Sequence, residues 1–205
     1  MKNKFELIKK GRPKLKNGDL FYYKINDCTY VGVIIQSQKY MNDRDDVKGY
    51  INCCLFLESS YKSIEEISID VVKNDILEQK LILPPTVINK RGWLNGFFIV
   101  FSNLDLSFAN DVLQEIRIIY SKYDIYDVNY SEVDDVPNCK LAGDIGIYSD
   151  AGVELLLQMS LDLDFAVENP EWYNPYKYYD DLREEFPALE EFPFWYYKAK
   201  QRLNK

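Results

Sequence analysis

The sequence predicts an α+β fold with a mainly antiparallel, strongly twisted sheet, short helices and a helical C-terminal segment. Many short β-rich runs start at Gly18 and are separated by turn residues. Helix-favouring composition appears later, after Asp150 and again from Tyr178. Strands grouped before helices favour an α+β arrangement over alternating units. A partial barrel is the alternative form of the same sheet.

The first two strands are predicted to form a hairpin. Residues 19–25 (DLFYYKI) and 29–36 (TYVGVIIQ) are rich in aromatic and β-branched side chains, and Asn26-Asp27 lies between them. Such a spacing is typical of a tight hairpin turn. Gly32 inside the second run predicts a bulge or a close backbone approach.

Residues 50–57 (YINCCLFL) form a continuous apolar run, which predicts a strand buried on both faces. Neighbours on a strand point to opposite faces, so Cys53 and Cys54 are poorly placed to bind one metal. We expect both to be buried small apolar side chains.

The next stretch combines a helix signal with a proline break. Ser63 and Glu66 have the spacing of a capping box, which predicts one or two helical turns. Residues 71–83 fit a helix or a strand. Pro84-Pro85 is expected to end that run, because proline cannot donate to a strand ladder.

Other elements follow from local pattern. Asp150 is expected to be an N-cap, before a helix that buries Val153, Leu156 and Leu157. Strands are predicted at 95–101, 123–130 and 144–149, a helix or strand at 110–120, and a short helix around 5–8.

The 205 residues allow one large domain with appendages. We expect a basic N-terminal lead-in at 1–17 and a β-rich domain at 18–160. Residues 161–205 are expected to be an acidic, aromatic, mainly helical extension that packs on the same domain.

The net charge and its distribution along the chain indicate which classes of partner the protein can bind. The net charge is −8, which disfavours nucleic-acid binding, since phosphate contacts need Lys and Arg. The first sixteen residues carry seven cations and one acid, whereas residues 162–197 carry ten acids and two cations. No signal peptide and no membrane-spanning run is recognised, and the cysteines lack a disulfide pattern, so a cytosolic location is expected.

The chain contains no histidine, which excludes Ser-His-Asp and Cys-His catalysis and histidine metal sites. Glycine-rich phosphate loops are missing as well. Asp43, Asp45 and Asp46 could hold a hard cation, but they lack the later ligands of a calcium loop. A carboxylate-based metal-dependent phosphoester hydrolase is therefore an alternative; otherwise no metal and no cofactor is expected.

Aromatic side chains gather with acids near the C-terminus, at 172–179 and 194–200. They could dock on the sheet, or form an exposed patch for a protein partner. The predicted partner-binding residues, chosen on charge and aromatic placement, are Asp43, Asp45, Asp46, Trp172, Tyr173, Asp180 and Asp181.

The order of these motifs resembles the immunity protein 26 family of bacterial polymorphic toxin systems. The resemblance rests on four segments, GRPKLKNGDLFYYKI, TYVGVII, SIEEI and LILPPTVINKRGWLNGFFIV. It covers roughly residues 12–150. Its most specific part is residues 81–98. The matching positions, expected to be structural, are Gly18, Asp19, Gly32, Pro84, Pro85, Arg91, Gly92, Trp93 and Gly96.

The resemblance implies a cytoplasmic, non-catalytic protein that binds and neutralises a cognate toxin domain. A nuclease toxin would fit, since an acidic inhibitor is steered onto a basic cleft. The phosphotriesterase label of some members is not carried over, because that chemistry typically uses histidine ligands. A structural interaction module is a further alternative.

For residues 81–101 the expected role is architectural. Pro84-Pro85 would end one strand, Arg91-Gly92 would turn the chain, Trp93 would pack on the core, and Asn95-Gly96 would start the next strand.

Overall fold

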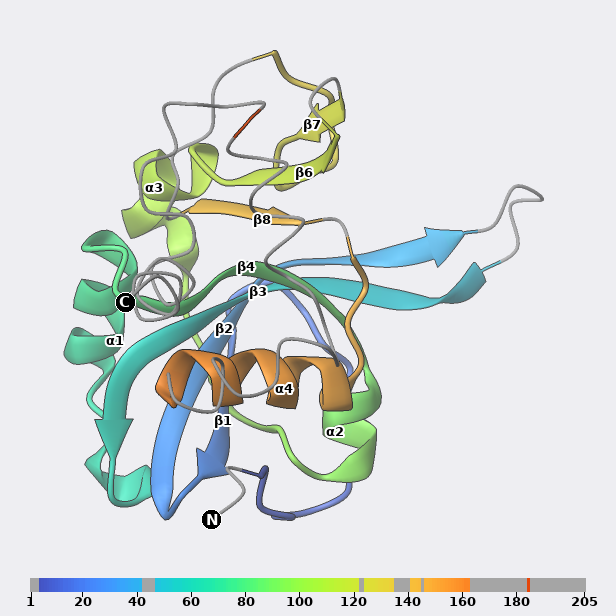
Figure 1. Ribbon diagram of the computed structural model, residues 1–205. Coiled ribbons are helices and arrows are strands. Elements are labelled where there is room, and N and C mark those ends of the chain that lie inside the picture. The colour runs from blue at the N-terminus through green and yellow to red at the C-terminus, as the bar shows by residue number, and fades with distance from the viewer. Residues whose placement is uncertain are drawn as a thin grey trace, which may run out of the picture.

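The computed structural model describes residues 4–41, 47–121, 124–134, 141–144, 146–162 and 184. It is an α+β fold, as the sequence predicts, with a five-stranded antiparallel sheet in the order β4-β3-β2-β1-β5 (Figure 1). A three-stranded sheet, ordered β7-β6-β8, lies beside it. Among the described strands β4 and β5 are the edges, so the large sheet is open there and does not close into a barrel.

The large sheet is built from long inner strands and shorter edges. Its strands are β1 (Asp19–Ile25), β2 (Cys28–Met41), β3 (Val47–Tyr61), β4 (Leu81–Asn89) and β5 (Ile99–Asn103). The small sheet holds β6 (Arg117–Ser121), β7 (Asp124–Tyr126) and β8 (Ala142–Asp144). The helices are α1 (Ile69–Leu77), α2 (Arg91–Asn95), α3 (Asn110–Gln114) and α4 (Asp150–Leu161), with 3₁₀ turns η1 (Ile64–Glu66) and η2 (Leu106–Ala109).

The hairpin forms as predicted. Ile25 pairs with Cys28, and the two turn residues have left-handed backbones, with φ 55° at Asn26 and 62° at Asp27. Asparagine and aspartate tolerate that conformation better than most residues. The predicted bulge at Gly32 is confirmed, since the β2–β3 register shifts beside it. The group that lies against Gly32 is the Phe21 ring and not a second backbone, and a Cβ there would enter that ring.

Both faces of the large sheet are covered, which explains the continuous apolar run of β3. Cys54 belongs to the core cluster that includes Phe21 and the buried face of α4, while Cys53 belongs to the cluster that includes α1. The two thiols point to opposite faces and are fully buried, as predicted. Burial raises the pKa of Cys53 to about 12 and raises that of Cys54 as well.

The prolines do not end a strand, so that prediction is wrong. β4 runs from Leu81 through both prolines to Asn89. Leu83 pairs with Phe56 and Thr86 with Cys54, so Pro84 and Pro85 together face one residue of β3. An edge strand with a bulge tolerates proline, and within the described residues no further strand of the large sheet lies outside β4 to require the missing N–H groups.

Several element boundaries differ from expectation. The ambiguous run 71–83 divides into α1 and the start of β4, and 110–120 divides into α3 and β6. Residues 95–98 are not strand: Asn95 ends α2, and β5 starts only at Ile99. A left-handed Gly96, with φ 88°, caps α2 and breaks the regularity.

The helix caps shift by small amounts. Ser149, not Asp150, is the N-cap of α4, and its hydroxyl accepts from the Gly152 N–H at 3.4 Å. The buried face of α4 contains Val153, Leu156 and Leu157, as predicted. Ser63 precedes a single 3₁₀ turn, without a capping-box bond from its side chain.

The segment 5–8 is not a helix, because its backbone bonds to other parts of the fold instead. Phe5 forms an isolated bridge to Ile25. The Glu6 N–H donates to the Lys24 carbonyl at 3.0 Å. Phe5 is buried and packs on Tyr23 and Phe98. The lead-in is thereby attached to the sheet and α2.

We predict that Gly32→Ala destabilises the fold by about 1–3 kcal/mol, because the new methyl overlaps the Phe21 ring. Urea unfolding measures the change. Gly49→Ala is the matched control on β3, since a Cβ there meets no atom within 4 Å. Equal effects at both glycines would contradict the packing argument.

We predict that stability falls as the pH rises from about 9 toward 12. Burial raises the pKa of Cys53 to about 12, and raises those of Cys54 and Tyr23, so these groups ionise in the unfolded chain first. The stability that these groups contribute is fully present below the pKa that they have in the unfolded chain. It is lost as the pH rises above that value toward their raised pKa in the folded protein. Urea midpoints across this range should fall less steeply for Cys53→Ala; an identical slope would contradict the assignment.

Candidate binding surface at α2

The position of α2 is set by one buried side chain, Trp93. The Trp93 ring meets Phe21 and Phe98 edge-on, with centroid distances of 5.1 and 5.2 Å, and is 1% exposed. Gly92 leaves room for this packing, because a Cβ there would enter the Phe98 ring. A five-residue helix has little stability alone. The Trp93 anchor therefore determines where α2 lies.

The N-terminal lead-in runs across α2 and brings its cations there. The N–H of Gly11 donates to the Trp93 carbonyl at 3.3 Å, and those of Ile8 and Lys9 donate to the Gly96 carbonyl at 2.8 and 3.1 Å. Lys9, Lys10 and Arg12 are exposed. Residues about eighty positions apart in sequence thus form one surface.

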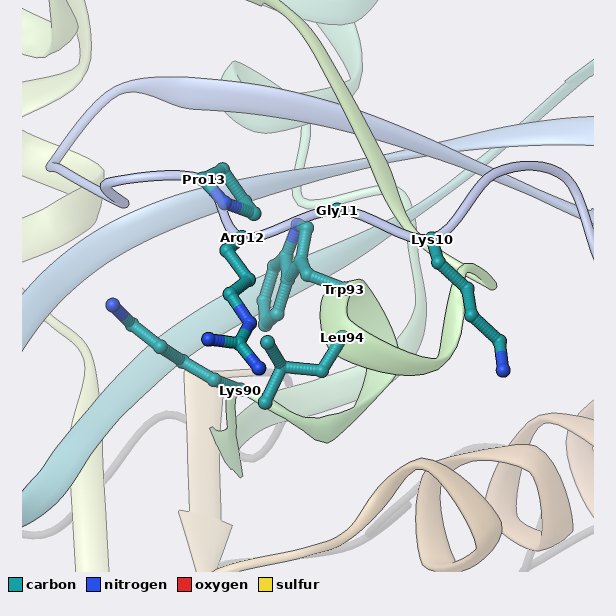
Figure 2. Close-up of a pocket in the computed structure, with 7 residues that line it drawn as sticks. All are labelled: Lys10, Gly11, Arg12, Pro13, Lys90, Trp93 and Leu94. Carbon is teal, nitrogen blue, oxygen red and sulfur yellow. The ribbon is translucent and has the colours of Figure 1, made fainter.

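A surface pocket of about 710 Å³ lies where these segments meet (Figure 2). Figure 2 shows the Arg12 guanidinium between Lys90 and Leu94, while the Lys10 side chain extends from the opposite side of Trp93. The lining residues are Lys10, Gly11, Arg12, Pro13, Lys90, Trp93 and Leu94.

The pocket is cationic. Arg12 and Lys90 form no ion pair with a carboxylate within the described part of the chain. The Lys90 ammonium lies 4.3 Å from the centre of the Tyr50 ring, which is a cation–π contact. Positive charge therefore accumulates here on a protein whose net charge is −8.

Apolar side chains accompany the cations. Leu94 is 41% exposed and lines the pocket, and Tyr50, below the Lys90 ammonium, is 40% exposed. Leu7, on the lead-in beside Gly96, is 65% exposed. Tyrosine and arginine are enriched in protein-binding hot spots, so Arg12 and the exposed ring of Tyr50 are side chains of the kind that bind a protein partner.

The backbone donors around the pocket are largely used within the fold. The Gly11 N–H donates to the Trp93 carbonyl, and the Leu94 N–H donates to the Lys90 carbonyl. The Arg91 N–H donates to the Asn89 Oδ1 at 2.9 Å. An anion at the Arg12 end of the pocket would accordingly be bound by the long side chains of Arg12 and Lys90, without a cradle of main-chain amides.

The far end of α2 is tied to α4. The Asn95 amide donates to Asp150 Oδ2 at 2.6 Å. This carboxylate therefore contacts Asn95, the last residue of α2. The bond keeps α2 oriented relative to the helix that covers the sheet.

The predicted motif residues are structural in different ways. Arg91 is exposed, whereas Gly92, Trp93 and Gly96 are buried around α2. Gly18 has a left-handed backbone, with φ 82°, and its N–H donates to the Ile34 carbonyl. The buried Asp19 carboxylate accepts two hydrogen bonds, from the Lys16 N–H at 3.0 Å and from Asn103 Nδ2 at 2.9 Å. The packing of Trp93 on the core is confirmed.

The predicted partner-binding residues cannot be placed, since all seven lie outside the described residues. They are Asp43, Asp45, Asp46, Trp172, Tyr173, Asp180 and Asp181. Sequence reasoning missed Arg12, Lys90 and Leu94. The available signal was the basic lead-in together with the pair Lys90-Arg91, but nothing local indicates that the two meet.

Within the described residues, no three His, Cys, Asp or Glu side chains gather closely enough to hold a metal ion. Asp43, Asp45 and Asp46 are not among those residues. Over the same part of the chain, no helix has the length and apolar character needed to span a membrane.

Comparisons with known proteins leave the resemblance described above as a prediction. No family model matches the chain, and no curated protein and no solved structure matches it either.

Proposed function

We propose that this chain is a cytoplasmic, non-catalytic immunity protein that binds and neutralises a cognate toxin domain of a polymorphic or contact-dependent toxin system. A nuclease is the toxin class we expect, because acidic inhibitors associate rapidly with basic clefts. The observation that carries the proposal is the surface formed around α2. Its buried residues hold the fold together, while its exposed ones present a mixed cationic and apolar surface suited to a protein partner.

The motif string that carries the family resemblance supports the same proposal. Residues 81–98 supply β4 and α2, and the positions matched there include the anchor Trp93 and Gly92, which leaves room for its packing. Gly96, matched as well, leaves room for the N-terminal lead-in. This segment carries Lys90 and Leu94 at the surface. A scaffold of this kind offers recognition without requiring a reactive group.

The proposal predicts that a neighbouring gene encodes the cognate toxin domain, and the decisive test is association of the chain with that domain. An inactivated version of that domain should co-purify with the chain, with a dissociation constant below about 1 μM, and the active version should be tolerated by cells only when the chain is present. A toxin domain from an unrelated system is the control. Absence of association at micromolar concentration would exclude the proposal.

A second prediction concerns the acidic C-terminal region. Charge reversal at Asp180 and Asp181 to Lys should slow association with the toxin domain and weaken its dependence on salt, because long-range attraction is lost. Stopped-flow association at two ionic strengths measures both effects. An unchanged on-rate would remove these residues from the contact surface.

A further inference from the structure

We propose that the pocket between residues 10–13 and α2 binds an acidic segment of the protein partner. Partner carboxylates would lie on Arg12 and Lys90, and an apolar partner side chain would lie on Leu94. This inference rests on the proposed function in one respect only, namely that the partner is a protein. The pocket would be a positively charged contact, in addition to the acidic contact surface predicted from the sequence.

Electrostatics is the first argument. Arg12 and Lys90 both line the pocket, and within the described residues neither has a carboxylate partner. Because no carboxylate of the described residues offsets either charge, both cations attract an anion that enters the pocket. The arrangement therefore favours a negatively charged ligand at the Arg12 end of the pocket.

The chemistry of the lining favours carboxylates on a peptide over a free phosphate. Dedicated phosphate sites use several backbone N–H groups that converge on the anion. Here the N–H groups of Gly11, Arg91 and Leu94 already donate within the fold. The indole of Trp93 is 1% exposed, so its face is not available for stacking on a nucleobase. Arginine pairs with carboxylate and with phosphate by two parallel hydrogen bonds, so the preference for carboxylate rests on the backbone amides that the fold already uses.

The apolar surroundings indicate a ligand larger than a single anion. Leu94 is exposed inside the pocket, and Tyr50 is exposed below the Lys90 ammonium. Leu7 is a further exposed apolar side chain, beside Gly96 at the C-terminal end of α2. Peptide segments that place an apolar residue between acids would cover these side chains and satisfy both cations.

The test uses a synthetic peptide, so it does not depend on the toxin. The probe is an acetylated, amidated heptapeptide with the sequence Glu-Asp-Phe-Glu-Leu-Asp-Glu, titrated into the full ¹⁵N-labelled chain at low salt. We expect shifts at the Trp93 indole N–H and at the amides of Arg12, Lys90 and Leu94. Inorganic pyrophosphate and the peptide with Gln and Asn replacing its acids are titrated in parallel.

Charge reversal separates the pocket from general attraction. Arg12→Glu and Lys90→Glu should each weaken peptide binding by about tenfold, because each replaces an attraction with a repulsion. Lys62→Glu alters the net charge by the same amount at an exposed position outside the pocket, and should change the affinity less than twofold. Leu94→Ser should weaken binding of the acidic peptide while leaving its salt dependence intact.

Each outcome has a definite meaning. Shifts confined to the pocket, seen with the acidic peptide and lost with its amide counterpart, support the inference. Equal or stronger shifts with pyrophosphate would overturn it in favour of a phosphate site, and no shifts at the pocket would overturn it outright. If a reversal variant fails to fold, the comparison of the two peptides on the unaltered chain still decides.

The two proposals can fail separately. If the toxin domain co-purifies but the peptide does not bind, the immunity function stands and the pocket is not its contact. Binding of the peptide without any association with the toxin domain would instead remove the immunity function and leave an acidic-peptide site.

Discussion

The structure depends on an aromatic cluster centred on Phe21. Its ring lies 5.1 Å from both Trp93 and Phe98 and 5.8 Å from Phe56, and so joins β1, β3 and the α2 segment. Close packing leaves such a centre little tolerance for added volume. Two glycines provide the space, because Gly32 faces Phe21 and Gly92 faces Phe98. Without them Trp93 could not reach the core, and α2 and the pocket beside it would have no defined position.

The place where positive charge gathers on the surface is determined by that packing and cannot be read from the composition. The chain is acidic overall, yet the lead-in is bonded to Trp93 and Gly96, and this brings Arg12 next to Lys90. Net charge describes long-range steering, while binding depends on the charges that share one surface. A basic pocket on an acidic protein fits a partner that carries both signs. The predicted acidic contact and the pocket would then bind different parts of it.

Local pattern was sufficient where neighbouring residues determine the structure. The β1–β2 hairpin could be predicted because Asn26-Asp27 supplies its own turn geometry, and the face of α4 because Val153, Leu156 and Leu157 recur with the helical period. The opposed thiols of Cys53 and Cys54 follow from strand alternation alone. The prediction that Pro84-Pro85 ends a strand was wrong, because an edge strand can tolerate proline. Which strand lies at the edge is decided by the topology of the whole sheet, and local sequence does not show it.

By itself, the sequence determined the fold class, the hairpin, the doubly buried β3 and the exclusion of histidine chemistry. Only the tertiary structure decided that β4 continues through its prolines, that Gly96 caps a helix, and that the lead-in meets α2. The physical reason is separation along the chain. Arg12 and Lys90 share a pocket because Trp93 is buried, and contacts between residues so far apart leave no periodic trace in the sequence.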